Sequence, residues 1–280
     1  MDQSRPAENI SLLGAPSFSV LLCVNQSNPH LADAIQSVLA QTDADFEFLI
    51  SANACPDELL EELEEIIGGD PRVKLFRTCI GQLAFNLNFL ADKARTEYLV
   101  RMDADDVSKP NRIETLRRSL REHPVDVIGS WVHLIDDRSQ RLGEFKLPVS
   151  HQDIVKRLPY GTVFIHPSVA IRRDFLLAMG GYLGGFVSED TDLWLRARRM
   201  GGTFKNIPDF LLDYRLHGGQ SIRSRLGYAE VAGQWLRELL LMPSWYAARG
   251  FFVSIGKCLL SPLINAFRAR KFAVKASRRG

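Results

Sequence analysis

The first hundred residues alternate between short apolar runs and longer amphipathic stretches. The apolar runs at 18–24, 46–50 and 73–76 have the length and composition of buried strands. Each is followed by a stretch with apolar residues three or four positions apart, which indicates a helix. Three strand–helix units in succession predict an α/β fold, with a Rossmann-like, mostly parallel sheet and helices on both faces.

Beyond residue 110 the spacing of strands and helices changes. A helix is expected at 110–121, followed by strands at 125–134 and 142–145 on either side of a polar turn at 136–139. Two strands joined by so short a turn are antiparallel, so the sheet is expected to have a small antiparallel part. Further along, the sequence predicts helices near 174–179 and at 191–200, strands at 169–172 and 203–207, and loops at 148–159 and 183–188.

An apolar run at 98–102 ends in three carboxylates, Asp103, Asp105 and Asp106. Because residues i and i+2 of a strand point to the same side, Asp103 and Asp105 are expected to project together from its carboxyl end. Ligands of open α/β sheets bind at that end, and two such carboxylates can hold a divalent cation that also takes phosphate oxygens. The acidic residues could instead solvate a turn and cap the next helix.

Charge is unevenly distributed along the chain. Of 280 residues, 46% are hydrophobic, which is ample for a core, and the formal net charge is +2. After Glu238 there are eight basic residues and no acidic one, whereas residues 1–238 hold the other 27 Lys and Arg and all 33 Asp and Glu. Because the positive charge is confined to the tail and no nucleic-acid-binding module accompanies it, nucleic acid is not expected as a partner.

Residues 239–280 interleave these cations with apolar side chains. No uncharged stretch there approaches the roughly 20 residues that span a bilayer. A basic amphipathic tail of this kind suits the surface of an anionic membrane, where each cation contributes on the order of 1 kcal/mol. The alternative is a C-terminal helix that packs on the domain.

The four cysteines, Cys23, Cys55, Cys79 and Cys258, show neither a CxxC pair nor the spacing of zinc ligands. We expect them to be reduced and to pack as small apolar residues, which indicates a reducing compartment. Residues 1–16 lack the basic-then-apolar order of a signal peptide. Together with the basic tail, this predicts a cytoplasmic protein, peripheral on the inner face of the cell membrane.

Five sequence segments occur in a fixed order between residues 18 and 222. They are SVLLCVN (19–25) with AIQSVLAQT (34–42); FEFLI (46–50) with Asn53 and Asp57; Asn88; RMDADD (101–106); and HPS (166–168) with GGY (180–182), SEDTDLWLR (188–196) and YRLH (214–217). In this order and spacing they resemble family 2 glycosyltransferases, inverting and nucleotide-sugar-dependent enzymes of the GT-A fold. The resemblance implies a GT-A domain at 18–238, between a polar segment at 1–17 and the tail at 239–280.

The resemblance implies a metal site at the acidic motif. Asp105 would ligate a divalent cation, Mn²⁺ or Mg²⁺, and Asp103 would lie toward the donor's ribose and help to hold the cation. His217 matches a position that reaches the metal or the diphosphate in some relatives, although a histidine next to two glycines is also typical of a surface loop. The cation would neutralise the departing phosphates as a Lewis acid, an effect worth several kcal/mol.

The resemblance also implies a catalytic base. Inversion needs one group to take the proton from the attacking hydroxyl on the face opposite the leaving group. Asp190 stands at the family's position for that base, and Glu189 would help to position substrate. The alternative is that this acidic pair only caps the following helix.

The implied donor-binding residues are Val24, Asn25, Asn53, Asn88 and Asp103. Many relatives have Asp at the position of Asn53, where it accepts the N3–H of uracil, and an asparagine amide oxygen can still accept. A UDP- or dTDP-sugar donor is therefore favoured. Cys23, Asn25 and Gln82 depart from the residues that are common in the family, so they leave the identity of the donor open.

The sequence thus predicts transfer of a sugar from a nucleoside-diphosphate sugar to a saccharide or lipid-linked saccharide, with inversion, in cell-surface polysaccharide synthesis. One alternative is a catalytically degenerate domain of the same fold that binds a nucleotide or a partner. A remote alternative is a haloacid-dehalogenase-type phosphatase, because an apolar strand that ends in Asp-x-Asp also describes its nucleophile motif. That motif normally opens its domain, whereas here about a hundred residues precede it.

Overall fold

The computed structural model describes residues 17–185, 187–216 and 225–277, with side chains as far as residue 261. In this part of the chain the strands form one nine-stranded sheet in the order β3-β2-β1-β4-β8-β6-β9-β5, with β7 paired to β6. The strands are β1 (Phe18–Val24), β2 (Phe46–Asn53), β3 (Val73–Thr78), β4 (Tyr98–Met102), β5 (Val107–Ser108), β6 (Val127–Ile135), β7 (Arg141–Phe145), β8 (Ala170–Arg172) and β9 (Phe204–Arg215).

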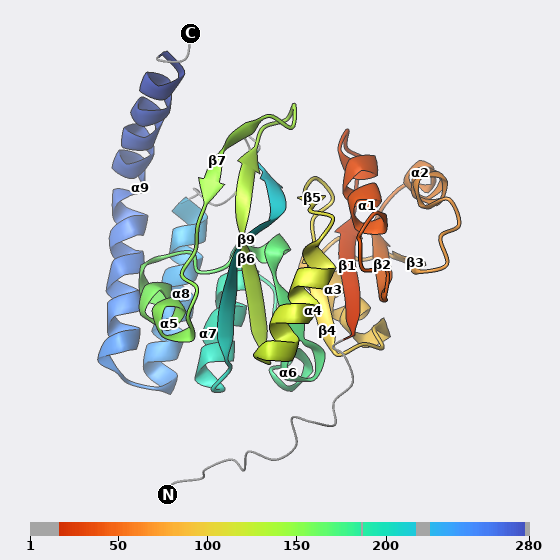
Figure 1. Cartoon of the computed structure of the whole chain (residues 1–280). Coiled ribbons are helices and arrows are strands. Elements are labelled where there is room, and N and C mark those ends of the chain that lie inside the picture. The colour runs from red at the N-terminus through yellow and green to blue at the C-terminus, as the bar shows by residue number, and fades with distance from the viewer. Residues whose placement is uncertain (1–16, 186, 217–224, 278–280) are drawn as a thin grey trace, which may run out of the picture.

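Helices cover both faces of the sheet (Figure 1). Helices α1 and α2 lie beside the first strands, and α8 and α9 lie at the opposite side of the molecule. The helices are α1 (Leu31–Leu39), α2 (Asp57–Ile67), α3 (Leu83–Lys93), α4 (Arg112–Glu122), α5 (His151–Arg157), α6 (Arg173–Ala178), α7 (Glu189–Arg199), α8 (Arg225–Leu241) and α9 (Trp245–Ser277).

The first four strands confirm the predicted α/β architecture. β3, β2, β1 and β4 pair in parallel, because each of the strand–helix units returns the chain to the same edge of the sheet. Alternate strand residues point to opposite faces, so β1 sends Val20 and Leu22 into one hydrophobic core and Leu21 into another. The sheet is therefore buried on both sides, and its strand ends are held rigidly.

The antiparallel part lies in the second half of the chain, as predicted. β8 pairs antiparallel with both β4 and β6, β7 pairs antiparallel with β6, and β5 pairs antiparallel with β9. β6 and β9 run parallel and continue the sheet beyond β8. The carboxyl ends of β4 and β9 thus lie on either side of the segment that contains the acidic motif.

Two elements differ from the expectations for this region. Helix α5 lies within the stretch 148–159 that we interpreted as a loop; Ser150 caps it by accepting a hydrogen bond from the Asp153 N–H at 3.2 Å. β9 does not end at Ile207 but continues to Arg215. Pro208 lacks an N–H, and the strand passes it with register shifts opposite Ser130 and Trp131 of β6.

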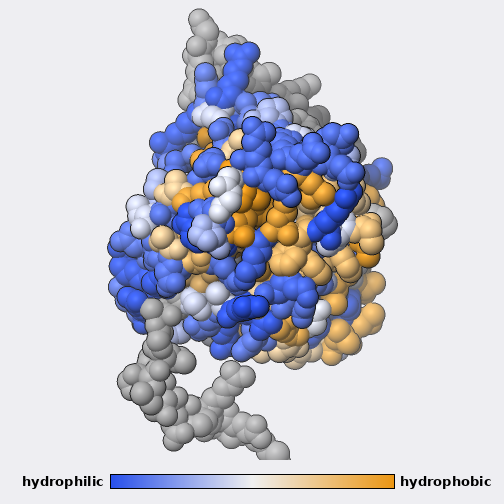
Figure 2. All heavy atoms as spheres, turned by 90° about the vertical axis from the view of Figure 1, so that its right-hand side faces the viewer, coloured by the Kyte–Doolittle hydropathy of each residue, from blue (hydrophilic) through white to orange (hydrophobic). Residues whose placement is uncertain are grey.

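The edge of the sheet at β3 shows how the molecule limits strand pairing with other chains. Lys74 and Arg77 place charged side chains along this edge strand. Figure 2 views the molecule from this side and shows hydrophobic side chains from the middle of the face to its lower right edge, with hydrophilic ones mainly at the left and top.

Helices α8 and α9 form an antiparallel pair that packs on the domain. Gly250 of α9 lies so close to the Trp235 ring of α8 that a Cβ there would collide with it. The Tyr246 hydroxyl donates to the Val155 carbonyl at 2.8 Å, and Ala247 is buried. The first half of the predicted tail is thus joined to the domain. No described helix has both the length and the apolar character needed to span a membrane.

Candidate functional site

An acidic cluster lies directly after β4. The side chains of Asp103, Asp105 and Asp106 each offer an oxygen atom, and these atoms lie within 4.8 Å of one another. β4 is buried along its whole length, so the position at which the chain leaves the sheet is fixed. Asp103 and Asp105 lie together, as the two-residue period of a strand predicts, and Asp106 joins them.

Arg215 at the end of β9 holds the acidic segment in place through hydrogen bonds. Its backbone N–H donates to Asp106 Oδ1 at 2.8 Å, and its buried guanidinium donates to the Asp105 carbonyl at 2.7 Å and to the Asp136 carbonyl at 2.6 Å. The segment is therefore attached to the β6–β7 turn. The sequence predicts no role for Asp106 or Arg215, although Arg215 belongs to the YRLH segment.

The electrostatics of this cluster favour a cation. Burial raises the pKa of Asp106 well above its ordinary value, and the nearby Asp103 and Asp105 raise it further. Arg101 donates a hydrogen bond to Asp103 and offsets part of the negative charge. Asp106 Oδ2 is buried with no hydrogen-bond partner among the described residues. A compact set of carboxylate oxygens with an unused buried acceptor fits a hard divalent ion such as Mg²⁺ or Mn²⁺.

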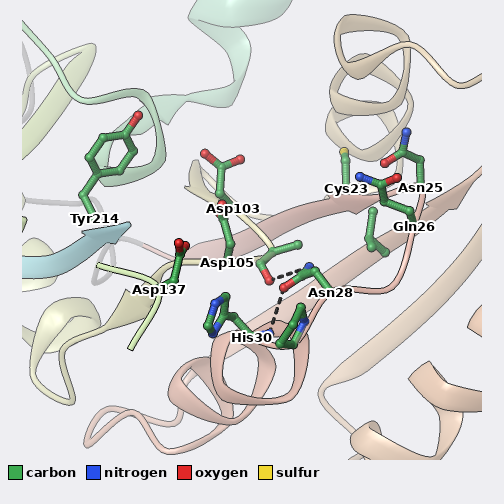
Figure 3. Close-up of a pocket in the computed structure, with 12 residues that line it drawn as sticks. Cys23, Asn25, Gln26, Asn28, His30, Asp103, Asp105, Asp137 and Tyr214 are labelled. Atoms are coloured by element: carbon green, nitrogen blue, oxygen red, sulfur yellow. Dashed lines mark hydrogen bonds between the residues drawn. The ribbon is translucent and has the colours of Figure 1, made fainter. Parts of the chain in front are cut away.

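A pocket of about 740 Å³ opens between the end of β1 and the acidic cluster (Figure 3). The Asn28 amide donates to the Ala104 carbonyl at 3.2 Å and accepts from the His30 N–H at 2.9 Å, so the loop after β1 is joined to the acidic segment. The pocket brings together three of the implied donor-binding residues, Val24, Asn25 and Asp103, with a second acidic metal candidate, Asp105. Its lining residues are Cys23, Val24, Asn25, Gln26, Asn28, Pro29, His30, Asp103, Ala104, Asp105, Asp137 and Tyr214.

The other two implied donor-binding residues lie outside this lining. Asn53 ends β2 and is 5% exposed, and its Oδ1 has no hydrogen-bond partner among the described residues. Asn88 holds the backbone of Tyr182: its amide donates to the Tyr182 carbonyl at 2.7 Å and accepts from the Tyr182 N–H at 2.8 Å. Gly181 precedes this contact at φ +69°, and a Cβ there would collide with the Asn88 amide. Asn88 and the GGY segment are thus one structural unit.

Glu189 and Asp190 begin α7. Asp190 accepts hydrogen bonds from the Thr191 N–H at 2.6 Å and the Thr191 hydroxyl at 3.4 Å. Burial raises the pKa of Asp190 to about 6, and the neighbouring Glu189 contributes to the rise. Burial likewise raises the pKa of Glu189, which Arg101 lowers and Asp103 raises. The charges of Arg101 and Asp103 beside the acidic cluster therefore also act on Glu189.

Glu189 also lines a second, smaller pocket. It has a volume of about 280 Å³ and lies between the start of α3 and the segment before α7. Its lining residues are Gly81, Gln82, Leu83, Ala84, Gly185, Val187 and Glu189. Asp103 and Asp105 thus line one pocket and Glu189 lines another, which suits an enzyme with two substrates. His217, the third candidate ligand, lies outside the described residues.

Comparisons with known proteins agree with this arrangement. The family model for glycosyl transferase family 2 matches residues 19–179. The chain is 36% identical over 226 residues to the O-antigen biosynthesis glycosyltransferase WbnJ of Escherichia coli, covering 80% of this chain and 89% of that protein. It is 28% identical over 207 residues to the E. coli UDP-Gal:alpha-D-GlcNAc-diphosphoundecaprenol beta-1,3-galactosyltransferase, covering 71% and 74%.

The fold is similar to that of a solved glycosyltransferase. The mannosyltransferase PcManGT from Pyrobaculum calidifontis superposes with a TM-score of 0.66 at 14% identity, covering 97% of this chain and 77% of that one. The chain belongs to family 2 of the glycosyltransferases. It is an enzyme of the GT-A fold that transfers a sugar from a nucleotide-sugar donor, and the family in general is inverting and metal-assisted. The phosphatase alternative is thereby excluded.

Proposed function

We propose that this enzyme transfers a sugar from a uridine or thymidine diphosphate donor to a lipid-linked saccharide during the synthesis of a cell-surface polysaccharide. The observation that carries the proposal is the presence of acidic side chains in the lining of each of two pockets, Asp103 and Asp105 in the larger and Glu189 in the smaller. The names of two relatives support it, since one is an O-antigen biosynthesis enzyme and the other uses UDP-Gal and a diphosphoundecaprenol-linked acceptor.

In this proposal Asp105 and Asp103 hold the divalent cation at the larger pocket. When bound, a cation of this kind supplies positive charge for the leaving diphosphate. Asp106 and Arg215 keep the acidic segment in place, because they attach it to β9 and to the β6–β7 turn. His217 is proposed as a further ligand on the sequence alone.

Asp190 is the proposed base, and Glu189 positions substrate beside it. A base must be ionised at the working pH yet hold a proton well enough to remove it from a hydroxyl. A carboxyl with a pKa of about 6 meets both requirements near neutral pH. Thr191 donates to Oδ1 of Asp190, so Oδ2 is the oxygen available to the acceptor hydroxyl.

Asn53 supports a uracil or thymine base in the donor. Its buried Oδ1 lacks a partner among the described residues, and leaving such an acceptor unpaired costs roughly 1–3 kcal/mol. The N3–H of uracil or thymine would supply the missing donor. Val24 and Asn25 at the end of β1 are proposed to flank the nucleotide. Asn88 is proposed to act on the site through the Tyr182 backbone that it holds.

Thermal-shift measurements against a panel of nucleoside diphosphates, with Mn²⁺ or Mg²⁺, test the donor assignment. We expect metal-dependent stabilisation by UDP or dTDP and slow hydrolysis of the matching donor sugar. Asp190→Asn is expected to keep that stabilisation and to lose transfer. Stabilisation without turnover in the wild type would support the catalytically degenerate alternative, and unchanged turnover in Asp190→Asn would refute the role of the base.

The lipid-linked acceptor is proposed to be reached from the inner face of an anionic membrane. The outer face of α9 exposes Trp245, Phe252 and Leu259, which are 88%, 67% and 65% exposed and lie seven residues apart on one side of the helix. Leu240 and Met242 add exposed apolar surface just before α9. The sequence after Glu238 has basic residues and no acidic one, which matches an anionic surface.

A flotation assay with vesicles tests this surface without removing α9. The triple variant Trp245→Gln, Phe252→Ser, Leu259→Gln changes only exposed side chains, so the fold is retained. We expect it to lose binding to anionic vesicles, and we expect wild-type binding to weaken with added salt. Leu142→Gln on β7 is the matched control, because Leu142 is also exposed and apolar. Equal binding by the triple variant and the control would contradict the proposal.

A further inference from the structure

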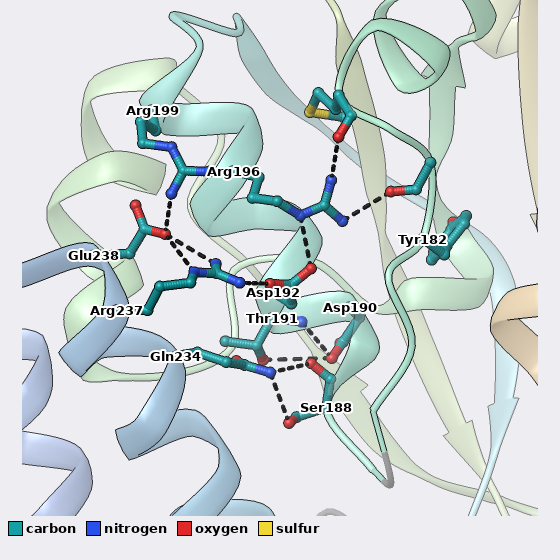
Figure 4. Close-up of polar contacts among 12 residues, drawn as sticks. Tyr182, Ser188, Asp190, Thr191, Asp192, Arg196, Arg199, Gln234, Arg237 and Glu238 are labelled. Carbon is teal, nitrogen blue, oxygen red and sulfur yellow. Dashed lines mark hydrogen bonds and ion pairs between the residues drawn. The ribbon is translucent and has the colours of Figure 1, made fainter. Parts of the chain in front are cut away.

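Helix α8 holds the segment that leads into α7 (Figure 4). The side-chain amide of Gln234 donates to the Ser188 carbonyl at 3.0 Å and to the Ser188 hydroxyl at 3.1 Å. One turn earlier, Glu230 accepts a hydrogen bond from the Val187 N–H at 3.1 Å. Residues 230 and 234 share one face of α8. Two consecutive residues before Glu189 are thus bound by side chains of a helix more than 40 residues further along the chain.

Ser188 is the residue at the N-cap position of α7, yet its hydroxyl makes no capping hydrogen bond within that helix. The carbonyl and the hydroxyl of Ser188 each accept a hydrogen bond from the Gln234 amide instead. Only the NH₂ group of an amide can donate a hydrogen bond to a carbonyl, so the Ser188 carbonyl determines which way the Gln234 amide is oriented. Its Oε1 is buried with no hydrogen-bond partner among the described residues. The Gln234 side chain therefore contributes its amide N–H donors, and not its oxygen, to the contact with Ser188.

The position of this first turn determines the position of the Asp190 carboxylate. Asp190 bonds only locally among the described contacts, to the N–H and hydroxyl of Thr191. Its carboxylate therefore moves with the first turn of α7. Further along, Asp192 accepts from Arg196 at 2.7 Å and from Arg237 of α8 at 2.5 Å, which fixes the next turn to the same helix.

We propose that Gln234 is a positioning residue for glycosyl transfer: through Ser188 it fixes the first turn of α7, and thereby the direction of the Asp190 carboxylate. The proposal rests on the proposed role of Asp190 as base. It assigns a function to α8, which lies beyond the residues 19–179 that match the family model. Displacement of a reacting group by about 1 Å can lower the rate by about 100-fold, so a small rotation of this turn is sufficient.

Two substitutions at this position separate positioning from packing. Gln234→Met keeps the length of the side chain and removes both donors, whereas Gln234→Lys restores a donor that can reach Ser188 beside the acidic Glu230. We expect Gln234→Met to lower kcat by about 10- to 100-fold with an unchanged KM for the donor. We expect Gln234→Lys to recover most of that loss.

Arg199→Met is the matched control within the same helix pair. It removes the 2.5 Å ion pair between Arg199 and Glu238 of α8, at the other end of α7 and about 14 Å along the helix from Asp190. We expect it to lower the melting temperature and to leave kcat unchanged. Wild-type kcat in Gln234→Met, no recovery in Gln234→Lys, or an equal loss of kcat in Arg199→Met would overturn the proposal.

Asp190→Asn, measured in the same assay, separates this proposal from the proposed function. If Asp190→Asn is inactive and Gln234→Met is fully active, the base assignment stands and the positioning role is refuted. If Asp190→Asn transfers sugar at the wild-type rate, the base assignment itself fails, and with it the role of Gln234.

Discussion

Replacing Asp190 by asparagine is expected to make the protein more stable at neutral pH while it abolishes transfer. The wild-type carboxylate is held where its ionised form is poorly solvated, since burial and Glu189 raise its pKa from 3.8 to about 6. Asparagine has the same shape, and its amide oxygen can still accept from the Thr191 N–H. The substitution therefore removes the buried charge without removing the local hydrogen bond.

The size and pH dependence of the gain follow from linkage. A rise in pKa from 3.8 to about 6 corresponds to about 3 kcal/mol, because a tenfold change in proton affinity is worth about 1.4 kcal/mol. The folded state binds the proton more tightly than the unfolded chain. Between about pH 4 and about pH 6 the unfolded chain has lost this proton while the folded carboxyl keeps it, so the stability of the wild type falls as pH rises through this range and the full penalty applies above pH 6.

Urea unfolding at a series of pH values measures this difference. We expect Asp190→Asn to exceed the wild type by up to about 3 kcal/mol at pH 7.5, with the difference shrinking toward zero near pH 4. Asp209→Asn is the control, because Asp209 is an exposed aspartate on β9 and should show no such difference. A difference that is absent at pH 7.5, or that is the same at both pH values, would refute the reasoning.

Three further variants test other contacts of the site. Because Asp190 must be ionised to act as base, kcat should rise with pH around an apparent pKa of about 6. Glu189→Gln should move this rise to lower pH, because it removes the negative charge that helps to raise the pKa of Asp190. A pH profile of kcat that does not move would contradict the contribution of Glu189. Arg215→Met should remove the hydrogen bonds to the Asp105 and Asp136 carbonyls and destabilise the fold by roughly 2 kcal/mol, measured by urea unfolding. Asn53→Leu should weaken UDP binding about tenfold in a calorimetric titration and leave ADP binding unchanged; equal losses for both would argue against recognition of the base by Asn53.

The acidic motif and its place in the fold could be predicted from the sequence. The apolar run at 98–102 defines a buried strand, and the period of a strand places Asp103 and Asp105 on one side. Both inferences depend only on neighbouring residues. The parallel order of the first four strands follows similarly from the repeated strand–helix units.

The contacts that fix the site could not be predicted in this way. Arg215 and Asp106 are 109 residues apart in sequence, and Gln234 and Ser188 are 46 residues apart, so no local pattern indicates that they meet. The resemblance to the family pointed to Asn88 as a donor-binding residue, and the structure shows that its amide holds the Tyr182 backbone. The continuation of β9 past Pro208 depends on register shifts opposite β6, which only the paired strand reveals.

In the proposed function Asp103 and Asp105 would hold a divalent cation, which would supply positive charge for the diphosphate of the donor. Calorimetric titration of UDP into the wild type and Asp105→Asn, each with and without Mn²⁺, tests this claim most directly. We predict that Mn²⁺ tightens UDP binding to the wild type by about tenfold or more, and that it makes no difference to Asp105→Asn. UDP binding to the wild type that does not depend on metal, or a full metal effect in Asp105→Asn, would contradict the claim.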